Sequence, residues 1–193
     1  MKILYITISL IVFALGIVIL MCFMSSSNQP TYSHNYKKAL QNKAIDIEKA
    51  GISAEWVGQQ FDSVMNHFKS PDVVDRAIIT FASEIYFNDT WHTHETPQTL
   101  GDYLKRTGEK VYDIDVQVDD VVVSEINAYV RWSMSITVNE GDEPISSVGM
   151  THLRFDENRQ IVTYQDYWDG VEGFYRTLPI IGGALEILRK KLD

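Results

Sequence analysis

The sequence predicts an α+β domain in which helices pack on one face of a bent antiparallel sheet. Segments with helical spacing of apolar residues fill most of the chain between residues 36 and 108. Four longer segments with alternating apolar residues follow, and the short polar segments between them are typical of turns. Helices followed by a run of hairpin-linked strands favour this class.

The composition excludes some classes of function. The chain has 193 residues, a formal net charge of −9 and a single cysteine, Cys22. An acidic surface repels phosphate backbones, so no nucleic-acid partner is expected. One cysteine cannot form a disulfide within the chain, so the sequence does not indicate a redox compartment.

Residues 3–24 carry no charge and predict a membrane anchor. A helix needs about 20 apolar residues to cross a bilayer, and this segment is longer than the apolar part of a cleavable signal peptide. Lipidation of Cys22 is the alternative, but Met21 stands where a small residue would be needed. We therefore expect residues 1–24 to be an uncleaved transmembrane anchor and the protein to be a single-pass membrane protein.

Basic residues flank the predicted anchor on both sides, Lys2 before it and Lys37, Lys38 and Lys43 after it, so the membrane side of the following domain stays open. Residues 25–52 are predicted to be a connection. Its first part, residues 25–34, is a polar linker, and residues 36–50 form a weakly amphipathic spacer helix.

Three firmer helices are expected next. Residues 53–69 carry an apolar stripe and begin at Ser53, a capping residue. A helix over residues 70–82 begins with Ser-Pro, and one over residues 96–108 begins with Thr-Pro. A short strand is predicted between the last two helices, over residues 83–91.

The remaining chain predicts four strands, over residues 110–125, 128–139, 144–155 and 160–168. A short amphipathic helix with a basic end follows and completes a domain over residues 53–193. This helix could lie on an anionic membrane surface or pack on protein, and packing is the favoured interpretation.

Asp166 raises the main functional question. Alternation along its strand places Val162, Tyr164, Asp166 and Trp168 on one face, so a carboxylate lies between aromatic rings. It is either a carboxyl with a raised pKa that moves a proton, or a hydrogen-bonded structural group.

The stretches "YFNDTWH" and "HLRFDENRQIVTYQDYWD" resemble the SnoaL-like branch of the nuclear transport factor 2-like superfamily, over about residues 53–192. The resemblance implies a cone made of a curled sheet and three helices, with a pocket at its open end. Polyketide cyclases, ketosteroid isomerase, limonene epoxide hydrolase and scytalone dehydratase share this scaffold, and many other members are not enzymes. The similar small proteins are bacterial, which implies a bacterial inner membrane for the anchor.

The resemblance assigns candidate catalytic residues. Asp166 matches a catalytic Asp of the polyketide cyclases and of the epoxide hydrolase, and Asp89 matches the general base of the isomerase. Thr151 stands where the isomerase has a protonated Asp. Where the epoxide hydrolase has an Arg and an Asp two residues apart on one strand, the inward residues of this chain are Val130 and Trp132, so neither mechanism is complete.

His92 lies three residues after Asp89 and is a third candidate, as an acid, base or donor at the pocket mouth. Asn-Asp-Thr is also ordinary turn chemistry, so Asp89 could simply end its strand. His92 and His94 share a face, but no third metal ligand accompanies them, so no metal is expected. His152 should point away from the pocket, towards the surface or a dimer interface.

Two functions remain in view. The favoured one is a membrane-anchored domain that binds a small, mostly apolar molecule without catalysis, and the alternative is an acid-base enzyme of the isomerase, cyclase or hydratase type that uses Asp166. No cofactor is expected, since no phosphate-binding glycine pattern is present. The predicted partners are the apolar molecule, the membrane through residues 3–24, and a second copy in a homodimer. The predicted ligand-binding residues are Trp132, Tyr164, Trp168, Thr151, Leu153 and Tyr86.

Overall fold

The computed structural model describes residues 32–170 and 179–192. The elements in chain order are α2 (Tyr32–Ala39), α3 (Ala54–Met65), α4 (Val73–Thr80), β1 (Phe81–Asn88), β2 (Thr93–His94), α5 (Pro97–Gly108), β3 (Asp113–Ser124), β4 (Asn127–Thr137), β5 (Ile145–Phe155), β6 (Ile161–Trp168) and α7 (Pro179–Leu192). The predicted anchor, residues 3–24, lies outside the described residues. Among the helices that are described, none is long and apolar enough to cross a membrane.

The predicted spacer helix over residues 36–50 is wrong beyond Ala39, where α2 ends. The chain continues in turns and extended residues, and the backbone N–H of Ile45 donates to the carbonyl of Phe155 at 2.9 Å. Ile47 is fully buried and donates its own N–H to the carbonyl of Glu125 at 2.6 Å. Tertiary burial outweighs the weak helical propensity here, so this segment is part of the core.

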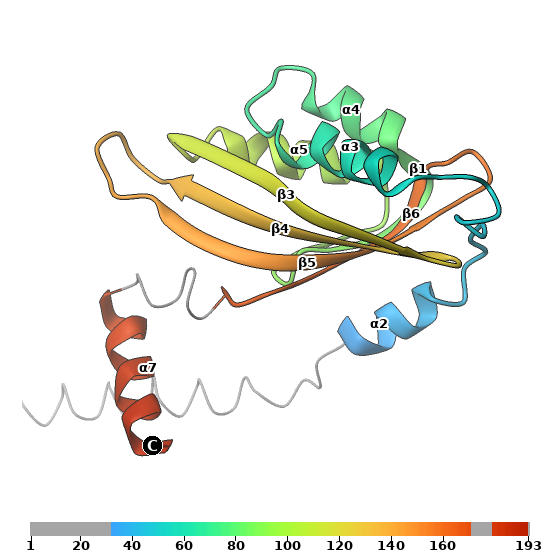
Figure 1. The fold of residues 1–193 in the computed structure, drawn as a ribbon. Helices are drawn as coiled ribbons and strands as arrows, with labels where there is room; N and C mark the ends of the chain where they lie inside the picture. Colours follow the sequence, from blue (N-terminus) through green and yellow to red (C-terminus); the bar gives the residue numbers. More distant parts are fainter. Residues whose placement is uncertain (1–31, 171–178, 193) are drawn as a thin grey trace, which may run out of the picture. The chain divides into compact units, whose positions relative to one another are not determined.

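Helices α3, α4 and α5 lie together on one face of the sheet, as predicted (Figure 1). The side chain of Ser53 accepts the backbone N–H of Trp56 at 3.1 Å and caps α3. Thr96 caps α5 in the same way, through the N–H of Thr99 at 3.3 Å. Each cap fixes where its helix begins, and thereby which side chains face the sheet.

Helix α4 ends at Thr80, two residues before the predicted end, because Phe81 already pairs with Ile161 of the last strand. Its N-cap is Asp72 and makes no side-chain capping bond. The shift also moves the following strand to Phe81–Asn88, so the predicted strand residues 89–91 form a turn instead.

The sheet is mixed, which corrects the prediction of a wholly antiparallel one. Its strand order is β2-β1-β6-β5-β4-β3. Strands β3 to β6 are antiparallel neighbours, as hairpin connections require, but β1 and β6 run parallel. A long crossover joins β1 to β6, and only such connections permit parallel pairing.

The inner face of the sheet packs under the helices and carries the core. Val130, Leu153 and Tyr164 all point to this face and are almost completely buried. His152 points to the outer face, as its alternation predicts, but it is buried rather than exposed. It bonds to the side chain of Asn127 at 2.8 Å, and its ring stacks on Tyr129 with centroids 5.0 Å apart. Burial lowers the pKa of His152 to about 4.

Candidate functional site

A cavity of about 480 Å³ lies between the inner face of the sheet and helices α3 and α5. Its size is within the range of pockets that hold small molecules, and most of its lining is apolar. The walls are formed by Phe61, Met65, Phe68, Phe87, Asp89, Trp91, Tyr103, Leu104, Thr107, Lys110, Val111, Val116, Trp132, Met134, Ile136, Val138, Ile145, Ser147, Tyr164, Asp166 and Trp168.

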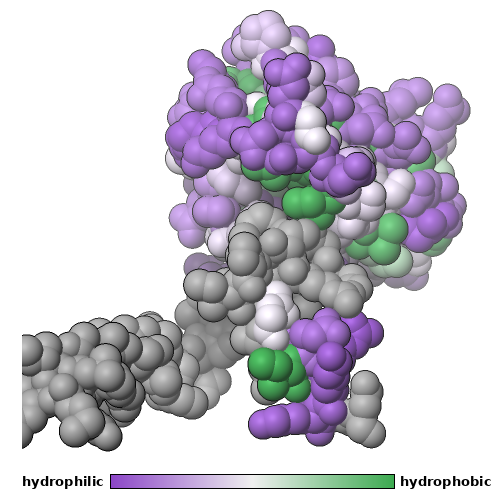
Figure 2. Space-filling view, turned by 90° about the vertical axis from the view of Figure 1, so that its left-hand side faces the viewer, coloured by the Kyte–Doolittle hydropathy of each residue, from purple (hydrophilic) through white to green (hydrophobic). Residues whose placement is uncertain are grey.

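The outside of the domain differs from this lining. On the face shown in Figure 2, most visible described residues are hydrophilic, and the hydrophobic ones gather in a few places between them. The free energy of transfer from water therefore favours the cavity, rather than this surface, as the place where an apolar molecule would bind.

Asp166 is the buried carboxyl of the cavity wall. Strand β6 brings it opposite Thr151 of β5, and the Thr151 hydroxyl donates a hydrogen bond to Asp166 Oδ1. The Tyr164 hydroxyl, two residues earlier on the same face, donates to Oδ2 at 3.3 Å. Only 5% of Asp166 is exposed to solvent, so these two hydroxyls replace most of its contact with water.

This burial changes the acidity of the carboxyl. Loss of solvent raises the pKa of Asp166 to about 8, and the nearby Asp89 carboxylate acts in the same direction. The hydrogen bonds from Thr151 and Tyr164 favour the charged form and partly oppose the rise. At neutral pH Asp166 therefore holds a proton, in a wall that is otherwise mostly apolar.

Three aromatic side chains frame Asp166, in agreement with the alternation read from the sequence. Trp132 donates its indole N–H to Thr151 Oγ1 at 2.8 Å. The Tyr164 ring stacks on Phe87 with centroids 4.5 Å apart. Trp168 donates its indole N–H to the backbone carbonyl of Asp89 at 3.0 Å. Each ring is thus held by a specific contact, which keeps the cavity walls in place.

Asp89 also lies on the cavity wall, but its oxygens are engaged. Oδ1 accepts the backbone N–H groups of Trp91 at 2.9 Å and His92 at 2.7 Å, and Oδ2 accepts the hydroxyl of Tyr103. Burial, and then the Asp89 carboxylate, raise the pKa of Tyr103. The geometry is that of a carboxylate that shapes a turn, which favours the structural interpretation of Asp89.

His92 is exposed and is not among the residues that line the cavity. Its ring packs on Tyr103, with centroids 4.7 Å apart, and the ring of His94 lies on the same tyrosine at 4.9 Å. Burial lowers the pKa of His94. The two histidines share a face, as predicted, but they cover Tyr103 from outside rather than point at the cavity.

The other predicted ligand-binding residues are placed differently. Thr151 and Leu153 are on the inner face but fully buried and do not line the cavity, and Thr151 is connected to the wall through its hydrogen bond to Asp166. Tyr86 does not line the cavity, which corrects its predicted role. Its hydroxyl donates to Gln165 Oε1 at 2.7 Å and accepts Asn88 Nδ2 at 3.2 Å, so it belongs to the outer side of the sheet.

The sequence analysis missed most of the other wall residues, and Phe87 and Tyr103 are two of them. Phe87 forms the wall beside Tyr164, and Tyr103 joins helix α5 to Asp89. The apolar stripe of the helix, with Leu100 and Leu104 buried, was the available signal for Tyr103, which lies next to it.

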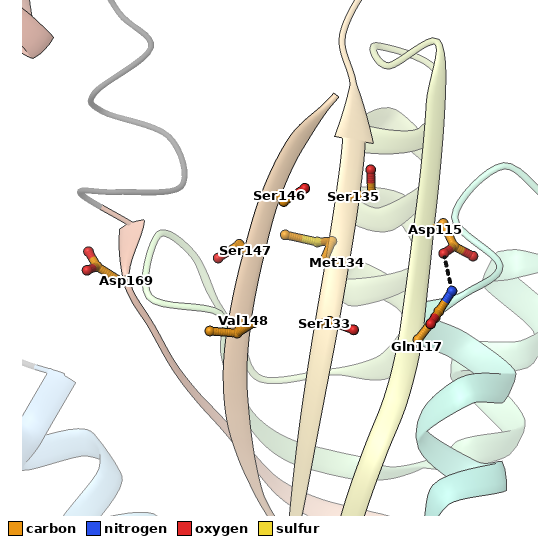
Figure 3. A pocket seen from close by; sticks show the side chains of 9 residues that line it. All are labelled: Asp115, Gln117, Ser133, Met134, Ser135, Ser146, Ser147, Val148 and Asp169. Carbon is orange, nitrogen blue, oxygen red and sulfur yellow. Dashed lines mark hydrogen bonds between the residues drawn. The ribbon is translucent and has the colours of Figure 1, made fainter. Parts of the chain in front are cut away.

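A second hollow, of about 460 Å³, opens along strands β3, β4 and β5 and is shown in Figure 3. Short polar side chains dominate its lining, and within it Gln117 donates to Asp115 at 2.9 Å. Ser133, Ser135 and Ser146 project from neighbouring strands into the same area (Figure 3). It lacks the apolar enclosure of the cavity around Asp166.

Several solved structures share the architecture of this domain. An epoxide hydrolase similar to limonene epoxide hydrolase, from Mycobacterium tuberculosis, aligns over 61% of this chain and 85% of its own, with 13% identity and a TM-score of 0.50. An NTF2-like protein of unknown function from an Exiguobacterium species aligns over 57% and 98%, with 18% identity and a TM-score of 0.50. A ketosteroid isomerase-like protein from Catenulispora acidiphila, in complex with trimethylamine, aligns over 60% and 88%, with 13% identity and a TM-score of 0.53.

These likenesses show an NTF2-like fold and, at such identities, the fold alone. The family follows from the sequence itself, because the SnoaL-like domain family matches residues 61–164, more than half of the chain. The protein belongs to the SnoaL-like domain family. No curated protein matches it.

Proposed function

We propose that the cavity binds a small, mostly apolar molecule whose one polar group forms a hydrogen bond with Asp166. The observation that supports this proposal most directly is a single buried carboxyl in the wall of a mostly apolar cavity of about 480 Å³. Apolar walls supply affinity, and one fixed polar group supplies orientation. Since Asp166 holds its proton at neutral pH, the favoured polar group is an acceptor such as a carbonyl.

Binding of the fluorescent naphthalene ketone prodan to the full-length chain tests this proposal. Asp166→Leu removes the hydrogen bond and keeps an apolar wall, so we expect the affinity to fall about tenfold, the effect of losing one hydrogen bond of about 1.4 kcal/mol. Glu84→Gln, which changes an exposed carboxylate, is the control and should bind as the unmodified protein does. Equal binding by Asp166→Leu, or no binding by the unmodified chain, would contradict the proposal.

Acid-base catalysis is the second candidate, and the raised pKa of Asp166 favours it. A carboxyl that titrates near pH 8 in an apolar cavity can remove a proton from carbon beside a carbonyl and return it. The arrangement of Asp89 does not assist, because hydrogen bonds already occupy both of its oxygens.

Deuterium exchange at the carbon next to the carbonyl of 2-tetralone, followed by NMR, tests for catalysis. If Asp166 is the base, the rate rises with pH through about 8, and Asp166→Asn removes the exchange while the chain stays folded. Exchange that is equal in Asp166→Asn, or absent in the unmodified protein, leaves binding as the only function of the cavity.

We also propose that residues 3–24 tether the domain to a membrane as a single-pass anchor. The support is the uncharged apolar composition of this segment, which is long enough to span a bilayer. After separation of membranes by centrifugation and a wash at high salt and high pH, the full chain should stay in the pellet. A chain lacking residues 1–24 should be released, and recovery of the full chain in the supernatant would refute the tether.

A further inference from the structure

Three buried side chains form a directed chain of hydrogen bonds that ends at Asp166 in the cavity wall. The indole N–H of Trp132 donates to Thr151 Oγ1 at 2.8 Å, and the hydroxyl of Thr151 donates to Asp166 Oδ1. Trp132 and Asp166 both line the cavity, whereas Thr151 between them is fully buried and does not. The buried hydroxyl of Thr151 therefore connects two side chains of the cavity wall.

The direction of these bonds follows from the donors available. An indole N–H can only donate, so Thr151 must accept from Trp132, and the one hydrogen of its hydroxyl is then directed to Asp166. Oδ1 of Asp166 therefore accepts the hydrogen bond from Thr151. The other contact of the carboxyl is weaker, since the 3.3 Å between Tyr164 and Oδ2 exceeds the usual length of an O–H···O bond.

A glycine makes the position of Trp132 possible. Gly149 lies opposite Trp132 in the pairing of β4 and β5, and a Cβ atom at Gly149 would meet Cζ2 of the indole at 2.3 Å and Cη2 at 2.6 Å. The ring thus lies directly on the backbone of β5. Even an alanine at residue 149 would displace the ring, and with it the N–H that reaches Thr151.

We propose that Gly149, Trp132 and Thr151 are positioning residues that reserve Oδ1 of Asp166 for a structural hydrogen bond and leave Oδ2 to exchange a proton with a molecule in the cavity. In the neutral carboxyl the proton lies on Oδ2 and is donated to an acceptor atom of that molecule. In the ionised carboxyl Oδ2 accepts a hydrogen from it. This inference rests on the proposed role of Asp166 as the polar group of the cavity.

The test is a titration of the Asp166 side-chain carboxyl by carbon-13 NMR in the full-length chain, with the signal assigned by its loss in Asp166→Asn. Thr151→Val keeps the shape and removes the donor, so the pKa of Asp166 should rise by about one pH unit, the equivalent of one hydrogen bond to a charged group. Thr151→Ser restores the donor and should restore the pKa. A structural filler role for Thr151 would not produce this rescue.

Trp132→Phe and Gly149→Ala test the earlier part of the series. Both remove the N–H from Thr151, the first by deletion and the second by displacement, so both should raise the pKa of Asp166 by less than Thr151→Val does, since only cooperative strengthening is lost. Gly183→Ala is the matched control, because a Cβ at Gly183 meets nothing within 4 Å and should leave the pKa unchanged.

An unchanged pKa in folded Thr151→Val, or a raised one in Thr151→Ser, would overturn the inference. If Thr151→Val fails to fold by circular dichroism, Trp132→Phe decides the question in its place. These measurements need no ligand. If the pKa changes as expected but the chain does not bind prodan, the positioning role is supported. Only the proposed binding function is then contradicted.

Discussion

The hydroxyl of Tyr103 donates to the carboxylate of Asp89, which joins helix α5 to the turn that follows β1. The same carboxylate accepts two backbone N–H groups of that turn. One side chain therefore holds together a helix and a turn that both form walls of the cavity.

Loss of the Asp89 carboxylate should reduce stability. We expect Asp89→Ala to lower the free energy of unfolding by about 1 to 3 kcal/mol, because it leaves the turn N–H groups and Tyr103 without an acceptor. Asp89→Asn keeps one acceptor oxygen and should cost less. Urea denaturation measures both, with exposed Glu95→Ala as the control. A fully stable Asp89→Ala would contradict the structural interpretation of this carboxylate.

The ionisation of Asp166 should be visible in how the stability of the protein depends on pH. Its pKa rises from 3.8 in the unfolded chain to about 8 in the folded one, so between these values the folded state binds the additional proton. Stability from this group is complete below pH about 4 and is lost as the pH rises through about 8. In Asp166→Asn this loss should disappear, and a chain that still loses stability between pH 6.5 and 8 would contradict the assignment.

His152 should change the stability with pH in the direction opposite to that of Asp166. Its pKa falls from 6.5 to about 4 on folding, so stability from this group is present above pH 6.5 and is lost as the pH falls through about 4. Between pH 4 and 6.5 the two residues largely cancel. His152→Gln keeps a partner for Asn127 and removes the titration, so its stability should already decline from pH 4 upward. Thermal unfolding at several pH values distinguishes these curves, and an unchanged curve in His152→Gln would be the contrary result.

Filling the cavity should prevent binding. Ser147 lies on the cavity wall, and the exposed Ser146 lies next to it on the other face of β5. Ser147→Trp should abolish prodan binding by occupying the space, whereas Ser146→Trp makes the same chemical change outside and should leave it intact. Fluorescence titration of both variants gives the comparison. Equal loss in the two would place the probe on the outer surface.

Ile47 should behave as a core residue. It is fully buried, so Ile47→Ala is expected to lower the free energy of unfolding by about 2 to 5 kcal/mol. Leu40→Ala changes an exposed residue of the same predicted helix and should cost no more than about 0.5 kcal/mol. Similar small effects in both variants, measured by urea denaturation, would restore the interpretation of residues 36–50 as a spacer.

Local signals predicted much of the fold. Ser53 and Thr96 marked the starts of two helices because caps satisfy backbone N–H groups within four residues of themselves. Alternation placed Trp132, Tyr164 and Asp166 on one face, and the structure brings all three to the cavity wall. Their function in binding or catalysis stays a prediction.

The sequence alone did not predict which strands pair when they are far apart in the chain. The parallel partner of β1 lies far along the chain, and no residue of β1 specifies it. Tyr86 was predicted to bind a ligand, but period-two alternation puts it on the face opposite Phe87 and Asp89, and only those two line the cavity. The bond between Thr151 and Asp166 depends on the register of β5 and β6, which the turn between them sets.

The pairing of β1 with β6 also determines the stage of folding at which the cavity forms. Asp89 and Trp168, which meet across this pair, are 79 positions apart in the chain. Contacts between residues so far apart in sequence form slowly. During synthesis they cannot form until the last strand has left the ribosome. Until that moment the inner residues of β1, such as Phe87, lack the ring of Tyr164 on which they stack. We therefore expect the nascent chain to be more prone to aggregation than the finished protein.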